Sequence, residues 1–161
     1  MNESAGTEKA IRVTLLGTGT PVLDLARQHS SILVEIGEEK LLFDCGRGVT
    51  MQLARMNIPS KQINIVFITH HHYDHICDLG EFLMTSWHNG HQQPFFIYGP
   101  NGTANIVAAL LGQVYARDID FALSHDASLI TKPIHERQMI KIADIFLQHC
   151  GASARQSIQN I

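Results

Sequence analysis

The sequence has few cysteines, no long apolar run and no excess of positive charge, and each absence excludes a class of protein. Its three cysteines, Cys45, Cys77 and Cys150, are odd in number and widely spaced, which argues against a disulfide framework. No stretch approaches the roughly 20 apolar residues that span a bilayer. The net charge of −3 gives no broad attraction to nucleic acid. Because residues 1–9 are polar and lack an apolar signal core, we expect a cytoplasmic protein with no membrane contact.

The composition is otherwise that of an ordinary globular domain. The chain has 161 residues, of which 45% are hydrophobic and 17% charged, enough to build one core. We therefore expect a single domain over 1–161, with a short flexible tail at 1–9. The ten histidines are the unusual feature, because four of them lie between positions 70 and 75.

The spacing of apolar residues predicts strands and helices that alternate along the chain. Strands are predicted at 11–16, 31–36, 40–44, 63–68, 94–98 and 119–123, and helices at 49–56, 79–87 and 104–116. The turn at 37–39 between the second and third strands predicts a hairpin. This order of elements favours a layered α/β fold.

The run Thr-His-His-His-Tyr-Asp-His at 69–75 directly follows the apolar strand predicted at 63–68. His70, His72 and Asp74 share one parity of an extended segment, and His75 follows on the turn. Imidazole and carboxylate groups are zinc ligands. One ion cannot easily take all four groups from so short a run, whereas two neighbouring ions can, and such pairs clamp the oxygens of an ester. His71 has the opposite parity, so we expect it to pack elsewhere.

The alternative to a metal site is a solvated histidine-rich loop. The regular spacing and the position after an apolar strand favour metal, and we predict two divalent ions, zinc first, with manganese or iron as alternatives.

Four segments together resemble the metallo-β-lactamase superfamily, and within it the ribonuclease Z and arylsulfatase-like branch. They are Leu-Gly-Thr-Gly-Thr-Pro at 16–21, Leu-Leu-Phe-Asp-Cys-Gly at 41–46, the histidine motif at 69–75 and Tyr-Gly-Pro at 98–100. The resemblance covers 11–125, about the first half of a typical member, and 126–161 match the family poorly. It implies an αββα sandwich that is incomplete in its C-terminal half.

The resemblance also implies roles for the site residues. His70 and His72 would bind one metal, and Asp74 and His75 a second, with a bridging hydroxide as nucleophile and Asp74 as the catalytic residue that orients it or moves a proton. Asp44 would hold a ligand histidine in orientation. A turn-capping role for Asp44 is equally open and compatible with this.

Members of this superfamily carry further ligands downstream, and here His149 is the only candidate, with an incidental histidine as the alternative. No Gly-Asp-Thr segment and no later histidine follow it. Half of the sandwich would then be missing, which leaves an apolar sheet face for a partner chain to cover, or indicates a truncated product.

The predicted function is metal-dependent hydrolysis of a phosphodiester or a sulfate ester, ribonuclease Z-like or arylsulfatase-like. RNA is one substrate, but RNA needs a basic surface and no Lys/Arg-rich insert is present, so a small-molecule ester is an equal candidate. The alternative is a truncated metal-binding fragment with little or no catalysis that acts through association. We expect a homo-oligomer.

Overall fold

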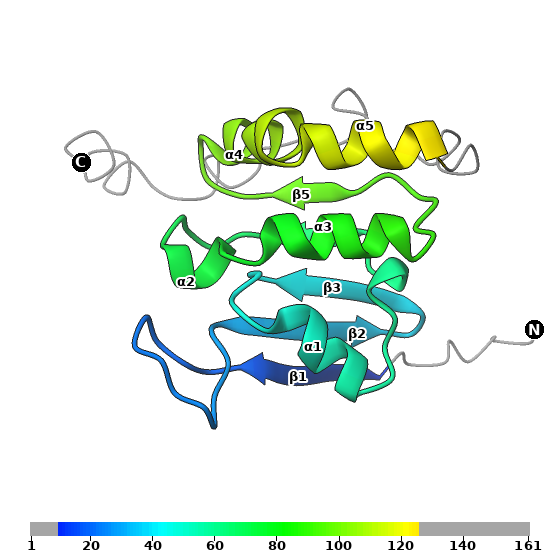
Figure 1. The fold of residues 1–161 in the computed structure, drawn as a ribbon. Coiled ribbons are helices and arrows are strands. Elements are labelled where there is room, and N and C mark those ends of the chain that lie inside the picture. Colours follow the sequence, from blue (N-terminus) through cyan, green and yellow to red (C-terminus); the bar gives the residue numbers. More distant parts are fainter. Residues whose placement is uncertain (1–9, 126–161) are drawn as a thin grey trace, which may run out of the picture.

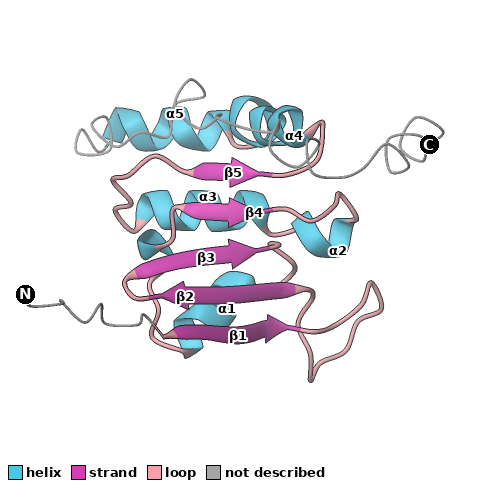
Figure 2. Ribbon diagram, turned by 180° about the vertical axis from the view of Figure 1, so that it is seen from behind, coloured by secondary structure: helices cyan, strands magenta, loops and turns pink. Residues whose placement is uncertain are grey.

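The computed structural model of the protein describes residues 10–125, so 1–9 and 126–161 lie outside the described residues. The described part is built on one five-stranded sheet whose strands lie side by side in chain order (Figure 2). The strands are β1 (Ile11–Gly17), β2 (Ser31–Ile36), β3 (Glu39–Phe43), β4 (Ile65–Phe67) and β5 (Phe96–Tyr98). β1 to β3 are antiparallel, whereas β3 to β5 are parallel.

The helices lie on one side of this sheet. They are α1 (Val49–Arg55), α2 (Tyr73–Ile76), α3 (Leu79–His88), α4 (Thr103–Ala109) and α5 (Ala116–His125), with a 3₁₀ turn η1 (Ser60–Gln62) and a π-helical turn η2 (Leu110–Val114). α1 and α3 cover one sheet face, and α4 and α5 lie along the β5 edge (Figure 1). The parallel strands are joined by helical crossovers, as the predicted α/β class requires.

Alternate residues of the strands supply the core between the sheet and the helices. Leu33, Leu42, Val66 and Ile97 are buried on this side, one from each of the four strands β2 to β5. They meet buried helical side chains: Val49, Leu53, Leu79, Phe82, Leu83, Trp87 and Val107. Each such side chain contributes roughly 1.5–3 kcal/mol by leaving water, so this two-layer core holds the site in place.

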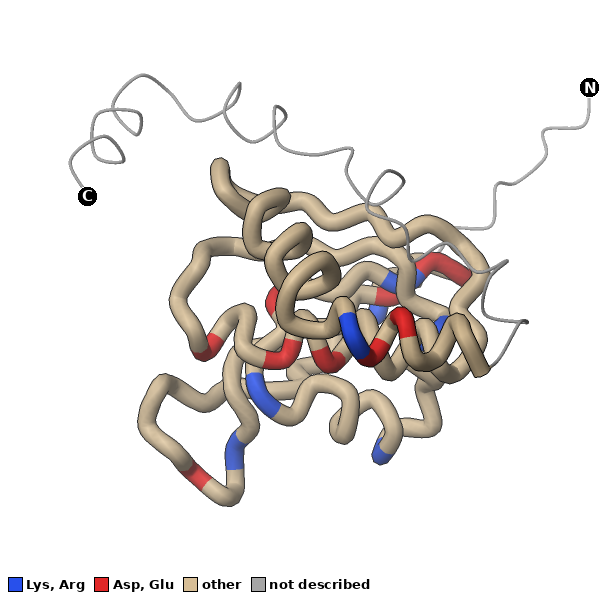
Figure 3. Tube along the Cα trace, turned by 45° about the horizontal axis from the view of Figure 1, so that its top comes forward, with Lys and Arg blue, Asp and Glu red and all other residues tan. Residues whose placement is uncertain are grey.

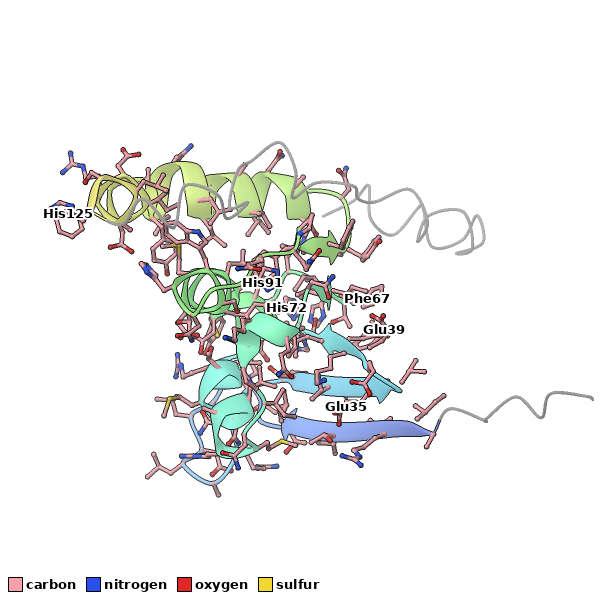
Figure 4. All side chains as sticks on the ribbon, turned by 90° about the vertical axis from the view of Figure 1, so that its right-hand side faces the viewer. Glu35, Glu39, Phe67, His72, His91 and His125 are labelled. Carbon is pink, nitrogen blue, oxygen red and sulfur yellow. The ribbon has the colours of Figure 1, made fainter. Side chains whose placement is uncertain are left out.

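The opposite sheet face is also apolar, and within residues 10–125 no element covers it. We call it the open sheet face; its residues have the other strand parity and are Ile11, Val13, Leu15, Ile32, Val34, Ile36, Leu41, Phe43, Ile65, Phe67, Phe96 and Tyr98. Figure 4 views the sheet from its side and shows Phe67 pointing away from the helices. The described part is therefore one helical layer and one sheet of the αββα sandwich, which confirms the predicted incomplete fold.

The predicted hairpin is present, and one predicted strand is wrong. β2 pairs with β3 from Ile36 opposite Glu39, and Gly37 in the turn has a φ of 61°, which suits glycine. Residues 119–123 form part of helix α5 and not a strand. The alternation of Ile119, Phe121 and Leu123 imitates a strand, but Phe121 is exposed while Ala122 is buried, which is a helical pattern.

The helix predicted at 104–116 is also interrupted. It begins at Thr103 as α4 and passes into the π-helical turn η2 from Leu110 to Val114. Among the described residues, no helix has the length and apolar character that crossing a bilayer requires.

Candidate metal centre

The histidine-rich segment lies at the edge of the sheet where the parallel strands β3 and β4 end. β4 ends at Phe67, His72 has extended backbone angles of φ −63° and ψ 143°, and α2 begins at Tyr73. Asp44 directly follows β3, the strand next to β4. The carboxyl ends of two neighbouring parallel strands therefore bring segments 25 to 31 residues apart in sequence into contact.

Asp44 is the centre of the hydrogen bonding at this edge. It is buried and has a φ of 61°, a conformation that Asp tolerates better than most residues. Its Oδ1 accepts from the backbone N–H of Thr69 at 2.8 Å, and its Oδ2 lies 2.7 Å from Nδ1 of His75. A carboxylate can only accept, so His75 carries its proton on Nδ1 and leaves the lone pair of Nε2 free.

Thr69 orients a second imidazole in the same way. Its hydroxyl lies 2.9 Å from Oδ2 of Asp44 and 3.0 Å from Nδ1 of His70. The hydroxyl has one proton, which the carboxylate takes, so Nδ1 of His70 must donate to the threonine oxygen. His70 therefore also presents the lone pair of Nε2. The sequence analysis missed this role of Thr69, because nothing in a lone threonine before the histidines signals it.

The structure brings together four of the five predicted metal ligands. The centroid of the His70 ring lies 4.5 Å from that of the His72 ring and 4.0 Å from that of the His75 ring. Nε2 of His75 lies 3.7 Å from Oδ2 of Asp74. The fifth, His149, lies outside the described residues.

Within residues 10–125, no three His, Cys, Asp or Glu side chains take up a ready-made metal-binding arrangement. Nε2 of His70 and Nδ1 of His72 nevertheless face each other at 3.0 Å. Two nitrogens bound to one tetrahedral zinc ion lie about 3.3 Å apart, so this separation is close to that of two ligands of one ion.

The residues nevertheless fit a cation. Asp74 is 4% exposed, and its Oδ1 is buried without a hydrogen-bond partner, which is costly for a carboxylate unless a cation or donor meets it. Burial, and then the neighbouring imidazoles of His75 and His72, lower the pKa of His70. A histidine with a lowered pKa is neutral near pH 7, so its nitrogen is available as a ligand.

His71 and the loop after β1 lie around this centre. Nε2 of His71 lies 2.8 Å from Oγ1 of Thr103, away from the other imidazoles, which confirms that its parity takes it elsewhere. The hydroxyl of Tyr73 donates to the carbonyl of Pro21 at 2.7 Å, and the Tyr73 ring meets the buried His29 ring edge-on. The Gly-Thr-Gly-Thr-Pro segment therefore lies beside the site, as its resemblance to a tight turn near a site mouth predicted.

The fold and the histidine-rich edge of its sheet place the protein in the metallo-β-lactamase class. Solved structures of that class match the chain. Human tRNase Z, short form (ELAC1), matches with a TM-score of 0.59 and 34% identity, covering 64% of this chain and 40% of that one. The metallo-beta-lactamase fold protein YhfI from Bacillus subtilis matches with a TM-score of 0.53 and 27% identity, covering 60% and 39%.

Within that class, the chain belongs to the family described as Anti-Pycsar protein Apyc1, whose model matches residues 11–159. Curated relatives agree with the ribonuclease Z resemblance. Ribonuclease Z of Mycobacterium sp. (strain KMS) is 43% identical over 131 residues, 78% of this chain and 46% of the relative. Ribonuclease Z of Mycobacterium bovis (strain BCG / Pasteur 1173P2) is 40% identical over 132 residues, 78% and 47%. The chain thus spans about half the length of the relatives it matches.

Proposed function

We propose that the protein is a metal-dependent phosphodiester hydrolase whose reaction takes place at the edge formed by β3 and β4. The observation that carries the proposal is the buried Asp44 carboxylate, which orients His75 directly and His70 through Thr69. Two imidazoles whose protons are fixed on Nδ1 keep Nε2 unprotonated, which a metal site requires of its ligands. The curated relatives named Ribonuclease Z support the phosphodiester class.

In this proposal His70 and His72 hold one divalent ion, and Asp74 and His75 hold a second, with His149 as a further ligand. The donor set suits zinc first and manganese or iron next. Such a pair of ions, when bound, lowers the pKa of water enough to supply hydroxide as the nucleophile near neutral pH.

The residues of the chain have their own tasks. Asp44 keeps the proton of His75 on Nδ1, and Thr69 does the same for His70. Asp74 is the catalytic residue in this scheme, because its Oδ1 has no hydrogen-bond partner and can take up a proton at the reaction centre.

A small phosphodiester fits the surface better than a long RNA. The chain has 12 Lys and Arg against 15 Asp and Glu. Along the described trace the basic positions are separated and interspersed with acidic ones, with no continuous basic track (Figure 3). Binding of an RNA backbone depends on such a track. Precursor tRNA and sulfate esters remain substrates to be compared directly.

The test combines a metal count with turnover of three substrates: bis(p-nitrophenyl) phosphate, p-nitrophenyl sulfate and a precursor tRNA. We expect two divalent ions per chain by elemental analysis and turnover of the phosphodiester that stops on chelation and returns with zinc or manganese. The proposal is wrong if the protein contains no zinc, manganese or iron and takes up none when their salts are added.

A metal-binding fragment with little catalysis is the second candidate, because the chain spans about half the length of its relatives. One weakly held ion per chain, without turnover of any of the three substrates, would establish this alternative.

Replacing Asp44 by Asn tests whether Asp44 positions a ligand. Asn tolerates the positive φ, but its NH₂ group cannot accept from Nδ1 of His75. We expect zinc affinity to fall by about 10–100-fold, as for other partners of ligand histidines. Competition against a chelator measures this, and a thermal melt checks the fold. Unchanged affinity with a lowered melting temperature would show that Asp44 only caps its turn.

A further inference from the structure

A polar cavity lies at the sheet edge opposite the proposed metal centre, and the proposed function does not use it. Its volume is about 340 Å³, near the lower limit for sites that bind small molecules. The metal centre follows the carboxyl ends of β3 and β4, whereas this cavity lies where the parallel strands begin. We call it the amino-end cavity; its walls are Glu38 and Lys40 around the start of β3, Lys61, Gln62 and Asn64 before β4, and His91 and Gln93 before β5.

The positive charge of this cavity has no counterpart nearby. Residues 10–125 contain two lysines, Lys40 and Lys61, and both line the amino-end cavity. Neither forms an ion pair within the described part of the chain. Lys40 lies opposite Glu35 in the ladder between β2 and β3, but the ion pair of Glu35 is with Arg12 on its other side, at 3.8 Å. Both ammonium groups are therefore available to a ligand.

Acceptor groups line the same cavity. Glu38 is exposed and forms no ion pair with another described residue, although two lysines share its cavity. His91 is 4% exposed, and burial lowers its pKa, so the ring is neutral near pH 7. Its Nδ1 lies 2.8 Å from the carbonyl oxygen of Lys61 and must donate to it, which makes Nε2 an acceptor. Among the described residues this buried Nε2 has no hydrogen-bond partner, which is costly.

Because the charges are held apart and not paired, they specify the chemistry of a ligand. Two ammonium groups suit a phosphate group, which lysine binds as a point charge. An ionised Glu38 and Nε2 of His91 can only accept, so they require hydroxyl donors. The side-chain amides of Gln62, Asn64 and Gln93 both donate and accept, so they suit further hydroxyl groups. A small molecule with a phosphate at one end and several hydroxyl groups meets all of these requirements.

We propose that the amino-end cavity binds a small sugar phosphate, with its phosphate on Lys40 and Lys61 and its hydroxyl groups on Glu38 and His91. Inorganic phosphate alone fits less well, because it leaves most of the acceptors unpaired and lies beside the Glu38 carboxylate. The inference is independent of the proposed hydrolysis, since none of these residues is a proposed metal ligand or orients one.

The test is calorimetric titration of the full chain with ribose 5-phosphate, ribose and inorganic phosphate. For a ligand of this size we expect ribose 5-phosphate to bind with a dissociation constant of about 1 mM or tighter. Ribose and phosphate should each bind at least about 10-fold more weakly, because each lacks half of the contacts. The titration is repeated on His72→Ala: binding at the amino-end cavity is unchanged in that variant, whereas binding through a metal ion is lost.

Lys61→Met is the decisive variant, and Arg55→Met is its matched control. Lys61 is exposed, so its loss leaves the fold intact, and Arg55 carries the same charge at an exposed position of α1 outside the cavity. We expect K61M to weaken binding of ribose 5-phosphate by about 10-fold and R55M to leave it unchanged, with thermal melts showing both variants folded.

Glu38→Ala separates recognition of a sugar from simple attraction of anions. The variant removes an acceptor for hydroxyl groups, while the repulsion that it relieves is the same for every phosphate. We therefore expect the preference for ribose 5-phosphate over inorganic phosphate to fall by about 5-fold or more. Three results would overturn the sugar-phosphate site: no saturable binding at about 10 mM ribose 5-phosphate, equal affinities in K61M and R55M, or a preference that E38A leaves unchanged.

Discussion

Replacing His72 by Ala is expected to abolish metal-dependent ester hydrolysis, whereas replacing its neighbour His71 by Ala leaves turnover nearly intact. His72 faces Nε2 of His70 at 3.0 Å within the proposed centre, while His71 reaches the hydroxyl of Thr103. Loss of a residue that only orients a ligand costs about 10–100-fold in affinity or activity. Loss of a ligand itself should exceed this, so we expect turnover to fall by at least about 100-fold.

His71→Ala is a matched control for His72→Ala, because the two variants remove the same side chain from adjacent positions. Turnover of bis(p-nitrophenyl) phosphate is measured at fixed zinc, together with bound zinc per chain. For His72→Ala we expect loss of one of the two ions as well as of turnover. Equal activity in both variants, or equal loss in both, would show that the parity of the segment does not decide which histidines bind metal.

The sequence was sufficient to single out this cluster of side chains because its signal is local. His70, His72, Asp74 and His75 lie within six positions directly after an apolar strand, and the structure brings all four together. The support around them is not local. Asp44 reaches His75 across 31 positions, and only the pairing of β3 with β4 makes this contact.

The alternation of side chains along the chain explains why the strand β2 was predicted correctly and why the strand predicted at 119–123 was wrong. In β2, adjacent residues such as Leu33 and Val34 point to opposite faces, and the following Gly-Glu-Glu turn supports the prediction of a strand. At 119–123 the same alternation arises by chance on a helix, with Phe121 on the exposed side. A five-residue window cannot separate these cases, because only burial shows which residues share a face.

Replacing Phe82 by Ala is expected to remove a large share of the free energy of unfolding. Phe82 lies on α3, is fully buried, and meets the buried Phe95 ring edge-on at 6.1 Å between centroids. Deleting such a ring costs about 3–5 kcal/mol, from lost apolar burial and from the cavity left behind. Domains of this size have about 5–15 kcal/mol of stability in all, so this loss is a large fraction of the total.

Phe121→Ala is the matched control, because it deletes the same side chain from an exposed position on α5. Phe121 is 62% exposed and, among the described residues, stacks only on His125, with centroids 4.1 Å apart. Its loss should change the free energy of unfolding by about 0.5 kcal/mol or less. Urea unfolding followed by circular dichroism compares the variants, and we expect the Phe82→Ala midpoint to fall by about 2 M while that of Phe121→Ala stays within error. If the two midpoints fell equally, α3 would not be packed against the sheet as described, because a core ring and a surface ring differ in cost only through burial.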